Sequence, residues 1–252
     1  MGGIQVIGIG GLPVIKEKDD LAGLICKAAE KQGTPIRDYD IIVISHIIVS
    51  RAEGNTVNLD EVVPSDFAKA FAEKADKDPA VVETVLRECK RIVRMDDRHL
   101  ITETKHGFVC ANSGVDQSNV PGERTVALLP VDSDSSARKI RRKIAELTGK
   151  KVAIIICDTH GRPLRMGQVN IALGVAGLQP IRDRRGETDL FGRVLRVKQT
   201  AVADELASAA ELVIGQADEG VPVAIIRGYK YPRSESATAK ELIRPKQEDL
   251  FI

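Results

Sequence analysis

Val152-Ala153-Ile154-Ile155-Ile156-Cys157 is a six-residue apolar run that leads directly into Asp158-Thr159-His160-Gly161. The run predicts a strand buried on both faces, because branched aliphatic side chains pack well on a pleated surface and no polar residue interrupts them. Ligands usually meet a sheet where its strands end, so the Asp158-Thr159 pair is a candidate site at the end of a central strand.

The same aliphatic bias extends over the whole chain. Hydrophobic residues make up 43% of the 252 residues and aromatic residues only 3%, so the core must consist mainly of Val, Ile, Leu and Ala. Strand and helix patterns follow one another without a regular βαβ rhythm, which favours an α+β fold of mixed sheets with packed helices. We expect one catalytic unit over residues 1–252 with two intimately joined subdomains, whose boundary the pattern does not place, and a charged C-terminal tail over 232–252.

Hydrophobic periodicity and capping residues predict the individual elements. The expected strands cover residues 4–9, 40–49, 100–104, 108–111, 125–131, 152–157, 169–175, 194–199 and 223–226. The expected helices run from Asp19 or Asp20 to Gly33, from Pro64-Ser65-Asp66, from Asp78-Pro79 with an apolar stripe reaching Val93, and over about 135–148 and 202–213. A short helix is expected in the tail.

The balance of charges excludes some classes of partner. Lys plus Arg (37) nearly cancels Asp plus Glu (36), and a net charge of +1 provides no field that attracts polyanions. Nucleic acid is therefore not expected as a partner. The basic segment 182–185 can hold a phosphate locally or can be a solvated loop.

Cysteine usage and hydropathy bear on the compartment. Cys26, Cys89, Cys110 and Cys157 form no C-x-x-C pair, so we expect free, buried thiols, as in a reducing cytosol. No signal peptide opens the sequence, and no apolar stretch approaches the roughly 18–20 residues that span a bilayer. We expect a soluble, cytoplasmic protein that makes no membrane contact.

Three polar loops interrupt strongly apolar elements: residues 114–119, the Asp158-Thr159 pair and residues 215–220. Carboxylates that converge in a dry site repel unless a cation lies between them. Oxygen donors such as Asp116, Asp158, Thr159 and Gln216 suit the hard ions Mg²⁺ or Mn²⁺. For each Asp alone, a turn or cap role is the alternative, and the sequence does not show whether the loops meet.

Glycines in two segments raise the question of nucleotide binding. Residues 215–220 can wrap an anion with backbone N–H groups, although a helix C-cap followed by a turn is the alternative for Gly215. The segment 8–13 is no dinucleotide fingerprint, because Pro13 stands where a glycine is needed, and no G-x-x-x-x-G-K-[ST] loop occurs. Among the histidines only His160, beside Asp158, is a candidate for chemistry.

Five segments, in order and at similar separations from residue 10 to about 228, resemble the coenzyme F420-0:γ-glutamyl ligase family. They are Gly11-Leu12-Pro13, Val49-Ser50-Arg51-Ala52-Glu53-Gly54, residues 112–120 (NSGVDQSNV), Asp158-Thr159-His160-Gly161-Arg162 with Arg165 and Gly167, and residues 215–222 (GQADEGVP). The resemblance implies a distinctive α+β fold in an intertwined homodimer. It also implies a GTP-dependent ligase that joins L-glutamate to F420-0, and a further glutamate to F420-1, with two divalent ions (Mg²⁺ or Mn²⁺) and K⁺.

Transferred by motif, the family's site falls on specific positions. The resemblance implies that Asp116 and Asp158 hold the first metal and that Thr159 and Gln216 hold the second. The implied nucleotide-lining residues are Gly10, Gly11, Leu12, Pro13, His46, Ile47, Arg51, Asn119, Ile214, Gly215, Gln216, Ala217, Asp218, Glu219, Gly220 and Val221. Arg51 stands where Lys is common and Gln216 where Glu is common, so the geometry around the nucleotide and the grip on the second metal differ from the usual pattern.

The implied mechanism is phosphorylation of the F420-0 carboxylate followed by displacement of phosphate by the glutamate amine. Asp116 and Asp158 serve catalysis through the metals, and Arg162 and Arg165 are candidates for binding substrate phosphate or carboxylates, with a surface role as the alternative. Two other functions stay open: a related ligase with a different acceptor or amino acid, and a nucleotide-sensing module without turnover.

Overall fold

A mixed sheet of five strands lies at the centre of the structure, a computed structural model that describes residues 3–250. In sheet order the strands are β1 (Gln5–Ile9), β12 (Val223–Arg227), β2 (Ile41–Ser45), β8 (Ala153–Gly161) and β9 (Gln168–Ala176). Only β2 and β8 are parallel, and the other neighbours are antiparallel. Between Ile156 and Cys157 the pairing of β8 with β9 shifts by one residue, so that Leu173 has no partner in the register.

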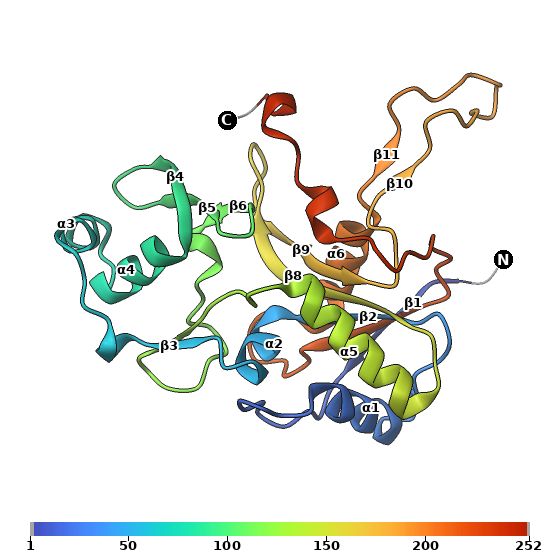
Figure 1. Cartoon of the computed structure of the whole chain (residues 1–252), viewed down its shortest axis with the longest axis horizontal. Helices are drawn as coiled ribbons and strands as arrows, with labels where there is room; N and C mark the ends of the chain where they lie inside the picture. The colour runs from blue at the N-terminus through green and yellow to red at the C-terminus, as the bar shows by residue number, and fades with distance from the viewer. Residues whose placement is uncertain (1–2, 251–252) are drawn as a thin grey trace.

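Helices cover both faces of this sheet (Figure 1). On one face, α1 (Leu21–Lys31) and α5 (Ser133–Thr148) pack against alternate side chains of the central strands, including Ile154 and Ile156. On the other face, α6 (Val202–Ile214) covers the intervening side chains, including Ile155. The strand at 152–157 is therefore buried on both faces, as its apolar run predicts.

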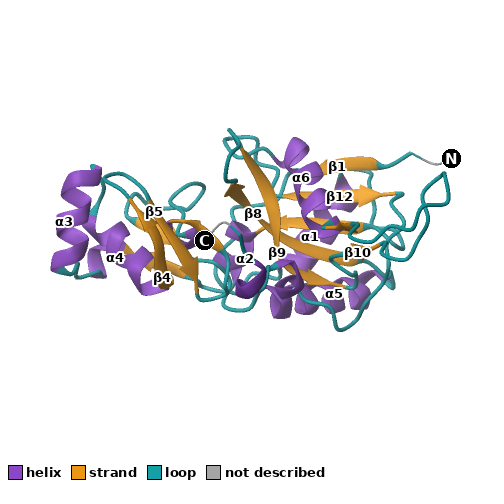
Figure 2. Ribbon diagram, turned by 90° about the horizontal axis from the view of Figure 1, so that it is seen from above, coloured by secondary structure: helices purple, strands orange, loops and turns teal. Residues whose placement is uncertain are grey.

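A second group of elements, which we call the small lobe (residues 56–127), lies at the opposite end of the molecule from β1 and β12 (Figure 2). It contains β3 (Thr56–Asn58), η1 (Leu59–Glu61), α3 (Asp66–Ala75), α4 (Pro79–Glu88), β4 (Cys89–Met95), β5 (Leu100–Thr104), β6 (Val109–Ala111), η2 (Asn112–Gly114) and β7 (Thr125–Ala127). Phe71, Val82 and Leu100 belong to a core of its own. The predicted α+β class of mixed sheets with packed helices is confirmed.

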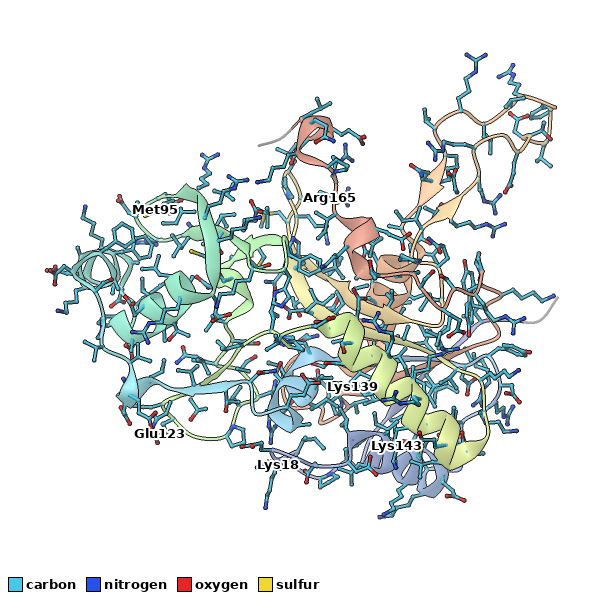
Figure 3. All side chains as sticks on the ribbon, in the orientation of Figure 1. Lys18, Met95, Glu123, Lys139, Lys143 and Arg165 are labelled. Carbon is cyan, nitrogen blue, oxygen red and sulfur yellow. The ribbon has the colours of Figure 1, made fainter. Side chains whose placement is uncertain are left out.

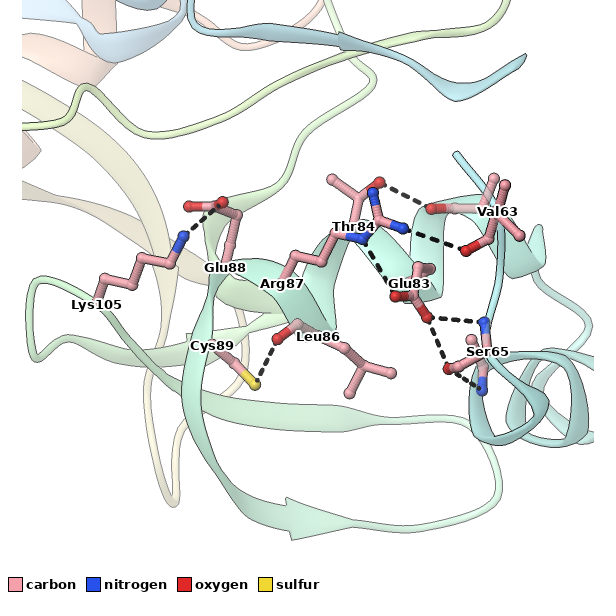
Figure 4. A network of polar contacts seen from close by, with 11 residues as sticks. Val63, Ser65, Glu83, Thr84, Leu86, Arg87, Glu88, Cys89 and Lys105 are labelled. Atoms are coloured by element: carbon pink, nitrogen blue, oxygen red, sulfur yellow. Dashed lines mark hydrogen bonds and ion pairs between the residues drawn. The ribbon is translucent and has the colours of Figure 1, made fainter. Parts of the chain in front are cut away.

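Polar contacts tie the helices of the small lobe together (Figure 4). The backbone N–H and the hydroxyl of Ser65, the N-cap of α3, donate to Glu83 on α4 over 3.0 and 2.7 Å. Arg87 pairs with the same carboxylate and donates to the carbonyl of Val63. The predicted caps Ser65 and Asp78 both accept from helical N–H groups, so the two helix starts are confirmed.

Several predicted boundaries are wrong. The expected strand at 40–49 ends at Ser45, and α2 (His46–Ala52) follows without a break. Burial on all sides makes the apolar segment compatible with either structure, so periodicity cannot separate them. The helix predicted to reach Val93 stops at Glu88, where β4 begins, and the strand at 125–131 is only three residues long.

An arm of residues 184–198 projects from the short strands β10 (Arg182–Asp183) and β11 (Gln199–Thr200) (Figure 1). The strand predicted at 194–199 is wrong over most of its length, because only Gln199 belongs to β11 and Val194 makes only an isolated bridge to Thr188. Leu190, Phe191 and Val197 are 98%, 88% and 87% exposed. These apolar residues have no cover within residues 3–250.

The tail after β12 contains two short 3₁₀ helices, η3 (Ala239–Leu242) and η4 (Lys246–Glu248), where a short helix was expected. Lys246 contacts Glu103 of the small lobe over 3.4 Å. All four cysteines are free; Cys157 is buried, and the other three are half-buried. Within residues 3–250, no helix combines the length and hydrophobicity needed to cross a membrane.

Candidate functional site

Asp158 and Thr159 lie inside β8, which continues to Gly161 beyond the predicted strand end. Asp158 Oδ1 accepts the Thr159 backbone N–H over 2.7 Å and lies 3.2 Å from Nε2 of His46, within ion-pair distance. Within residues 3–250, Oδ2 of Asp158 accepts no hydrogen bond, so this oxygen is available to a ligand.

His46, the first residue of α2, is only 1% exposed. Burial lowers the pKa of this imidazole, but the charge of Asp158, its hydrogen bonding and the more distant Asp116 outweigh burial, so the pKa is raised overall. The region around Asp158 is therefore electrically negative, and a positive charge is favoured there.

Asp116 reaches the same region from the segment that follows the small-lobe strand β6. An isolated bridge to Ala127 holds its backbone, with N–H···O distances of 3.0 and 2.8 Å. Its carboxylate accepts the backbone N–H and the hydroxyl of Ser118 over 2.7 and 2.8 Å. These contacts fix the orientation of the carboxylate before any ligand binds.

One cavity of about 350 Å³ is lined by all four side chains proposed as metal ligands: Asp116, Asp158, Thr159 and Gln216. The structure thus brings together three segments that are far apart in the sequence. Within residues 3–250 no group of three or more His, Cys, Asp or Glu side chains forms a metal cluster, so any ion here depends on the hydroxyl and amide oxygens as well as the carboxylates.

The donors fit a hard cation and do not fit a soft one. Cys110 also lines the cavity, but burial and the negative charge of Asp158 raise the pKa of its thiol to about 12. A single thiol among oxygen donors is not the ligand set of a zinc or copper site, and the oxygen donors suit Mg²⁺ or Mn²⁺.

A second cavity, of about 240 Å³, adjoins the first and shares Ser118 and Gln216 with it. Of the predicted nucleotide-lining residues it is lined by Leu12, Pro13, Ile47, Arg51, Asn119, Ile214, Gly215, Gln216, Ala217, Glu219, Gly220 and Val221. Gly10, Gly11, His46 and Asp218 do not line it. The backbone at Gly10 is engaged elsewhere, since its N–H donates to Gln32 over 3.1 Å.

Sequence reasoning missed further residues of this second cavity, namely Val14, Ile15, Ser45, Ile48, Ser118 and Pro222. They directly adjoin the predicted ones, so extending each motif by one or two positions finds them. Asn170 was missed for a different reason: it lies inside a predicted strand, and the only signal is an amide side chain within an otherwise apolar run.

Arg51 spans the rim of the second cavity. Its guanidinium donates to the carbonyl of Ile15 over 2.5 Å and to the carbonyl of Asn119 over 3.3 Å. Burial lowers the pKa of Arg51, partly offset by the charge of Asp19, yet the group stays protonated. Arg51 therefore joins two segments of the rim and supplies positive charge.

The loop at 215–220 presents its backbone N–H groups to negative charge. Gly215 and Gly220 both have positive φ angles, +63° and +65°. The N–H of Ala217 donates to the carboxylate of Glu219 over 2.8 Å, and hydrogen bonds from the backbone of Glu219 and Ala217 lower the pKa of that carboxyl. The loop already stabilises an anion, which is the behaviour expected of a phosphate-binding loop.

Arg162 and Arg165 are not brought together with the acids. Both lie in the turn between β8 and β9, outside the two cavities, and Arg165 extends into solvent (Figure 3). Arg162 donates to the carbonyl of Met166 over 3.1 Å. His160 faces a different cavity, and burial lowers its pKa against the raising effect of Asp158.

Comparison with known proteins adds to this geometry. The sequence profile described as F420-0:Gamma-glutamyl ligase matches residues 10–228. A protein of Methanothermobacter thermautotrophicus named coenzyme F420:L-glutamate ligase is 51% identical over 250 residues, covering 99% of both chains. Proteins of the same name from Methanocaldococcus jannaschii (49% identical, covering 98% of this chain and 96% of the relative) and Methanopyrus kandleri (47% identical, covering 100% of both) are also similar.

Proposed function

The chain belongs to the F420-0:gamma-glutamyl ligase family, and from this we propose that it is a coenzyme F420:L-glutamate ligase that adds L-glutamate to F420-0. We further propose that GTP drives the reaction, that a second glutamate is added to F420-1, and that two divalent ions, Mg²⁺ or Mn²⁺, and K⁺ take part. One observation carries the proposal: the oxygen-lined cavity around Asp116 and Asp158 adjoins a cavity bounded by a glycine-rich loop.

The chemistry requires activation of a carboxylate, because a free carboxylate has no leaving group. A carboxylate oxygen of F420-0 attacks the γ-phosphorus of GTP, and the bond to the bridging oxygen breaks to release GDP. The glutamate amine then attacks the acyl carbon, phosphate leaves, and the amine loses a proton to form the amide. Such phosphoryl transfer asks the protein mainly for positioning and for neutralisation of charge.

The residues of the first cavity fit two hard cations. Asp116 and Asp158 would hold one ion, and Thr159 and Gln216 the other. When bound, the ions supply charge stabilisation at the phosphates. The chain itself orients these donors: the Ser118 N–H and hydroxyl hold Asp116, and the Thr159 N–H holds Asp158.

The second cavity is assigned to the nucleotide. Arg51 supplies a positive charge at its rim, and the loop at 215–220 offers N–H groups where Glu219 now accepts one. Ser118 and Gln216 line both cavities, so a triphosphate in the second cavity has its terminal phosphates at the oxygen donors of the first. This continuity supports placing the transferred phosphate beside the proposed metal ligands.

Arg162 is proposed to contact a substrate anion. Its Nη1 is buried and has no hydrogen-bond partner within residues 3–250, so it retains a donor for a carboxylate or phosphate. Arg165, three residues further along the exposed turn, is proposed to act with it after the turn closes on the substrate. Both assignments depend on a movement of the β8–β9 turn toward the acids.

A homodimer in the cytoplasm completes the proposal. The arm of residues 184–198 carries exposed Leu190, Phe191 and Val197 away from the body of the molecule, where a second copy can cover them. Contiguous exposed apolar side chains usually mark an interaction site. The free thiols are those expected in a reducing compartment.

The decisive experiment incubates the protein with GTP, Mn²⁺, F420-0 and glutamate, followed by mass spectrometry of the products. Glutamyl addition together with GDP supports the proposal. GTP consumption only with another acceptor or amino acid points to a related ligase. Nucleotide binding without consumption points to a sensing module, and either outcome refutes the proposed activity.

A further inference from the structure

Asn170 is the third residue of β9 and is fully buried, with 0% exposure. Its backbone is fixed on both sides by α6: its N–H donates to Glu211 over 3.0 Å, and its carbonyl accepts from the hydroxyl of Ser208 over 2.8 Å. In the sheet register Asn170 lies directly opposite Thr159 of β8. An amide at such a position needs hydrogen-bond partners, because an unpaired buried polar group is costly.

Two partners of the Asn170 side chain, Thr159 and Gln216, line the oxygen-lined cavity. Its Oδ1 accepts from the hydroxyl of Thr159 over 3.1 Å and from the amide nitrogen of Gln216 over 3.3 Å. Its Nδ2 donates to Sγ of Cys157 over 3.6 Å. One carbonyl oxygen thus accepts protons from both side chains that we assign to the second cation.

The direction of these hydrogen bonds determines whether Thr159 and Gln216 present acceptors or donors to the cavity. Gln216 directs its NH₂ toward Asn170, so its carbonyl oxygen is left for the cavity. Thr159 commits its single proton to Asn170, so the lone pairs of its hydroxyl are left for the cavity. A cation requires acceptors and is repelled by N–H and O–H donors, so the network suits a cation.

The reversed orientation of the Asn170 amide would also satisfy every donor and acceptor in this network. If the Asn170 amide were reversed, Nδ2 would donate to Gln216 and Thr159, while Oδ1 would face the Cys157 thiol, which burial keeps protonated by raising its pKa. Gln216 and Thr159 would then present protons to the cavity. The orientation of a single buried amide therefore separates a cation-binding cavity from one that excludes cations.

We propose that Asn170 is a positioning residue that sets Thr159 and Gln216 with their acceptor oxygens toward the second divalent cation. The proposal rests on the proposed function in that it takes the metal site as given. It adds a residue that touches neither the ion nor a substrate. Residues that orient metal ligands typically contribute about 10- to 100-fold to metal affinity.

Two substitutions at Asn170 test this role. Asn170→Leu preserves approximate size and removes the acceptor, so we expect the second Mn²⁺ to bind about 10- to 100-fold more weakly while the first is unchanged. In its ionised form Asn170→Asp accepts from both partners and has no proton to donate, so we expect it to retain the second site. Mn²⁺ alone is titrated, with free ion measured by electron paramagnetic resonance, and folding is followed by circular dichroism.

A matched control removes a buried hydrogen bond elsewhere. Thr84 is 3% exposed in the small lobe, and its hydroxyl donates to the carbonyl of Ala80 over 2.8 Å. Thr84→Val should lower stability without changing either Mn²⁺ affinity. If Asn170→Leu does not fold, Asn170→Ala, which introduces no clash, takes its place in the same titration.

The outcomes separate this inference from the proposed function. If the unmodified protein binds no Mn²⁺, the metal site itself is wrong. If it binds two ions and Asn170→Leu also binds two with unchanged affinity, only the role of Asn170 is refuted. Equal weakening of both ions, or equal loss in the Leu and Asp variants, would refute it as well, because packing and not polarity would then be responsible.

Discussion

Asp158→Asn changes the charge of the cavity while preserving the size of the side chain. Asparagine can still accept the Thr159 backbone N–H, which holds Oδ1 over 2.7 Å in the native protein. What disappears is the negative charge beside His46 and the oxygen Oδ2 that accepts nothing within residues 3–250. The substitution therefore removes a metal ligand and leaves the local framework in place.

The expected magnitudes differ between activity and stability. A bound ion contributes several kcal/mol to the transition state of phosphoryl transfer, so a loss of about 4 kcal/mol is expected when a ligand carboxylate is removed. Because about 1.36 kcal/mol corresponds to a tenfold change in rate, turnover should fall about 1,000-fold. The fold loses only one charge-assisted contact to His46, about 1.5–3 kcal/mol, or a decrease in Tm of about 3–12 °C.

Three measurements check these expectations: mass spectrometry of glutamylated F420, Mn²⁺ titration and thermal unfolding. The matched control is Asp204→Asn. Asp204 is also half-buried, with a pKa raised by burial against its hydrogen bond from the Ala172 N–H, but it lies outside the cavity. The control should keep turnover within about threefold of the native protein, on the basis that it touches no reacting group.

Turnover of Asp158→Asn within tenfold of the native protein, with both Mn²⁺ ions still bound, would contradict the role of this carboxylate. An equal loss of turnover in Asp204→Asn would attribute the effect to general destabilisation. Either result would require a different set of metal ligands.

Four further predictions follow from individual contacts. Glu103→Gln should lower the free energy of unfolding by about 1–3 kcal/mol at pH 7. Hydrogen bonding to Arg91 and the nearby lysines lowers the pKa of the native carboxyl from 4.5 to about 2, so this stabilisation is present above pH 4.5 and lost as pH falls through about 2. Denaturant titrations at pH 7 and at about pH 2 that give the same difference in stability between the native protein and the variant would contradict it. Arg51→Met should weaken binding of a non-hydrolysable GTP analogue about 10- to 100-fold by calorimetry, since the positive charge at the rim is lost together with the two hydrogen bonds that join Ile15 and Asn119 there. Unchanged affinity would remove Arg51 from the nucleotide site. Gly174→Ala should lower the free energy of unfolding by about 1–3 kcal/mol, measured by thermal unfolding, because the added Cβ would lie 2.3 Å from the backbone carbon of Ser133. An unchanged Tm would show that α5 can shift freely. Phe191→Ser together with Leu190→Ser should convert a dimer to a monomer in analytical ultracentrifugation at unchanged Tm of the monomer; a dimer that persists would exclude the arm as its contact.

Local signals in the sequence predicted much of the secondary structure. Asp20, Ser65 and Asp78 are helix N-caps as expected, because a short acceptor side chain before an amphipathic segment has a local physical consequence that needs no tertiary context. The apolar segment at 40–49 lacked such a signal. Its division into β2 and α2 depends on what surrounds it, since both halves are buried.

The candidate site shows the same division between local and non-local information. Asp116 and Asp158 were singled out as acids beside apolar strands, and the structure places both at one cavity. Their convergence could not be derived from local pattern, because it results from packing of the small lobe against β8. The positions of Arg162 and Arg165 depend on a turn whose direction no periodicity encodes, and their proposed roles remain predictions.

The unpaired Leu173 between β8 and β9 has a consequence for how the protein can vary. Before the shift the paired residue numbers sum to 330, as for Ile156 with Gly174; after it they sum to 329, as for Thr159 with Asn170. If Leu173 were present but the pairing continued without the shift, the sum would stay at 330 and Ile171, not Asn170, would lie opposite Thr159. The one-residue bulge therefore lets β9 carry an additional residue while Asn170 stays opposite Thr159, and deletion of Leu173 would straighten the strand without breaking that pair.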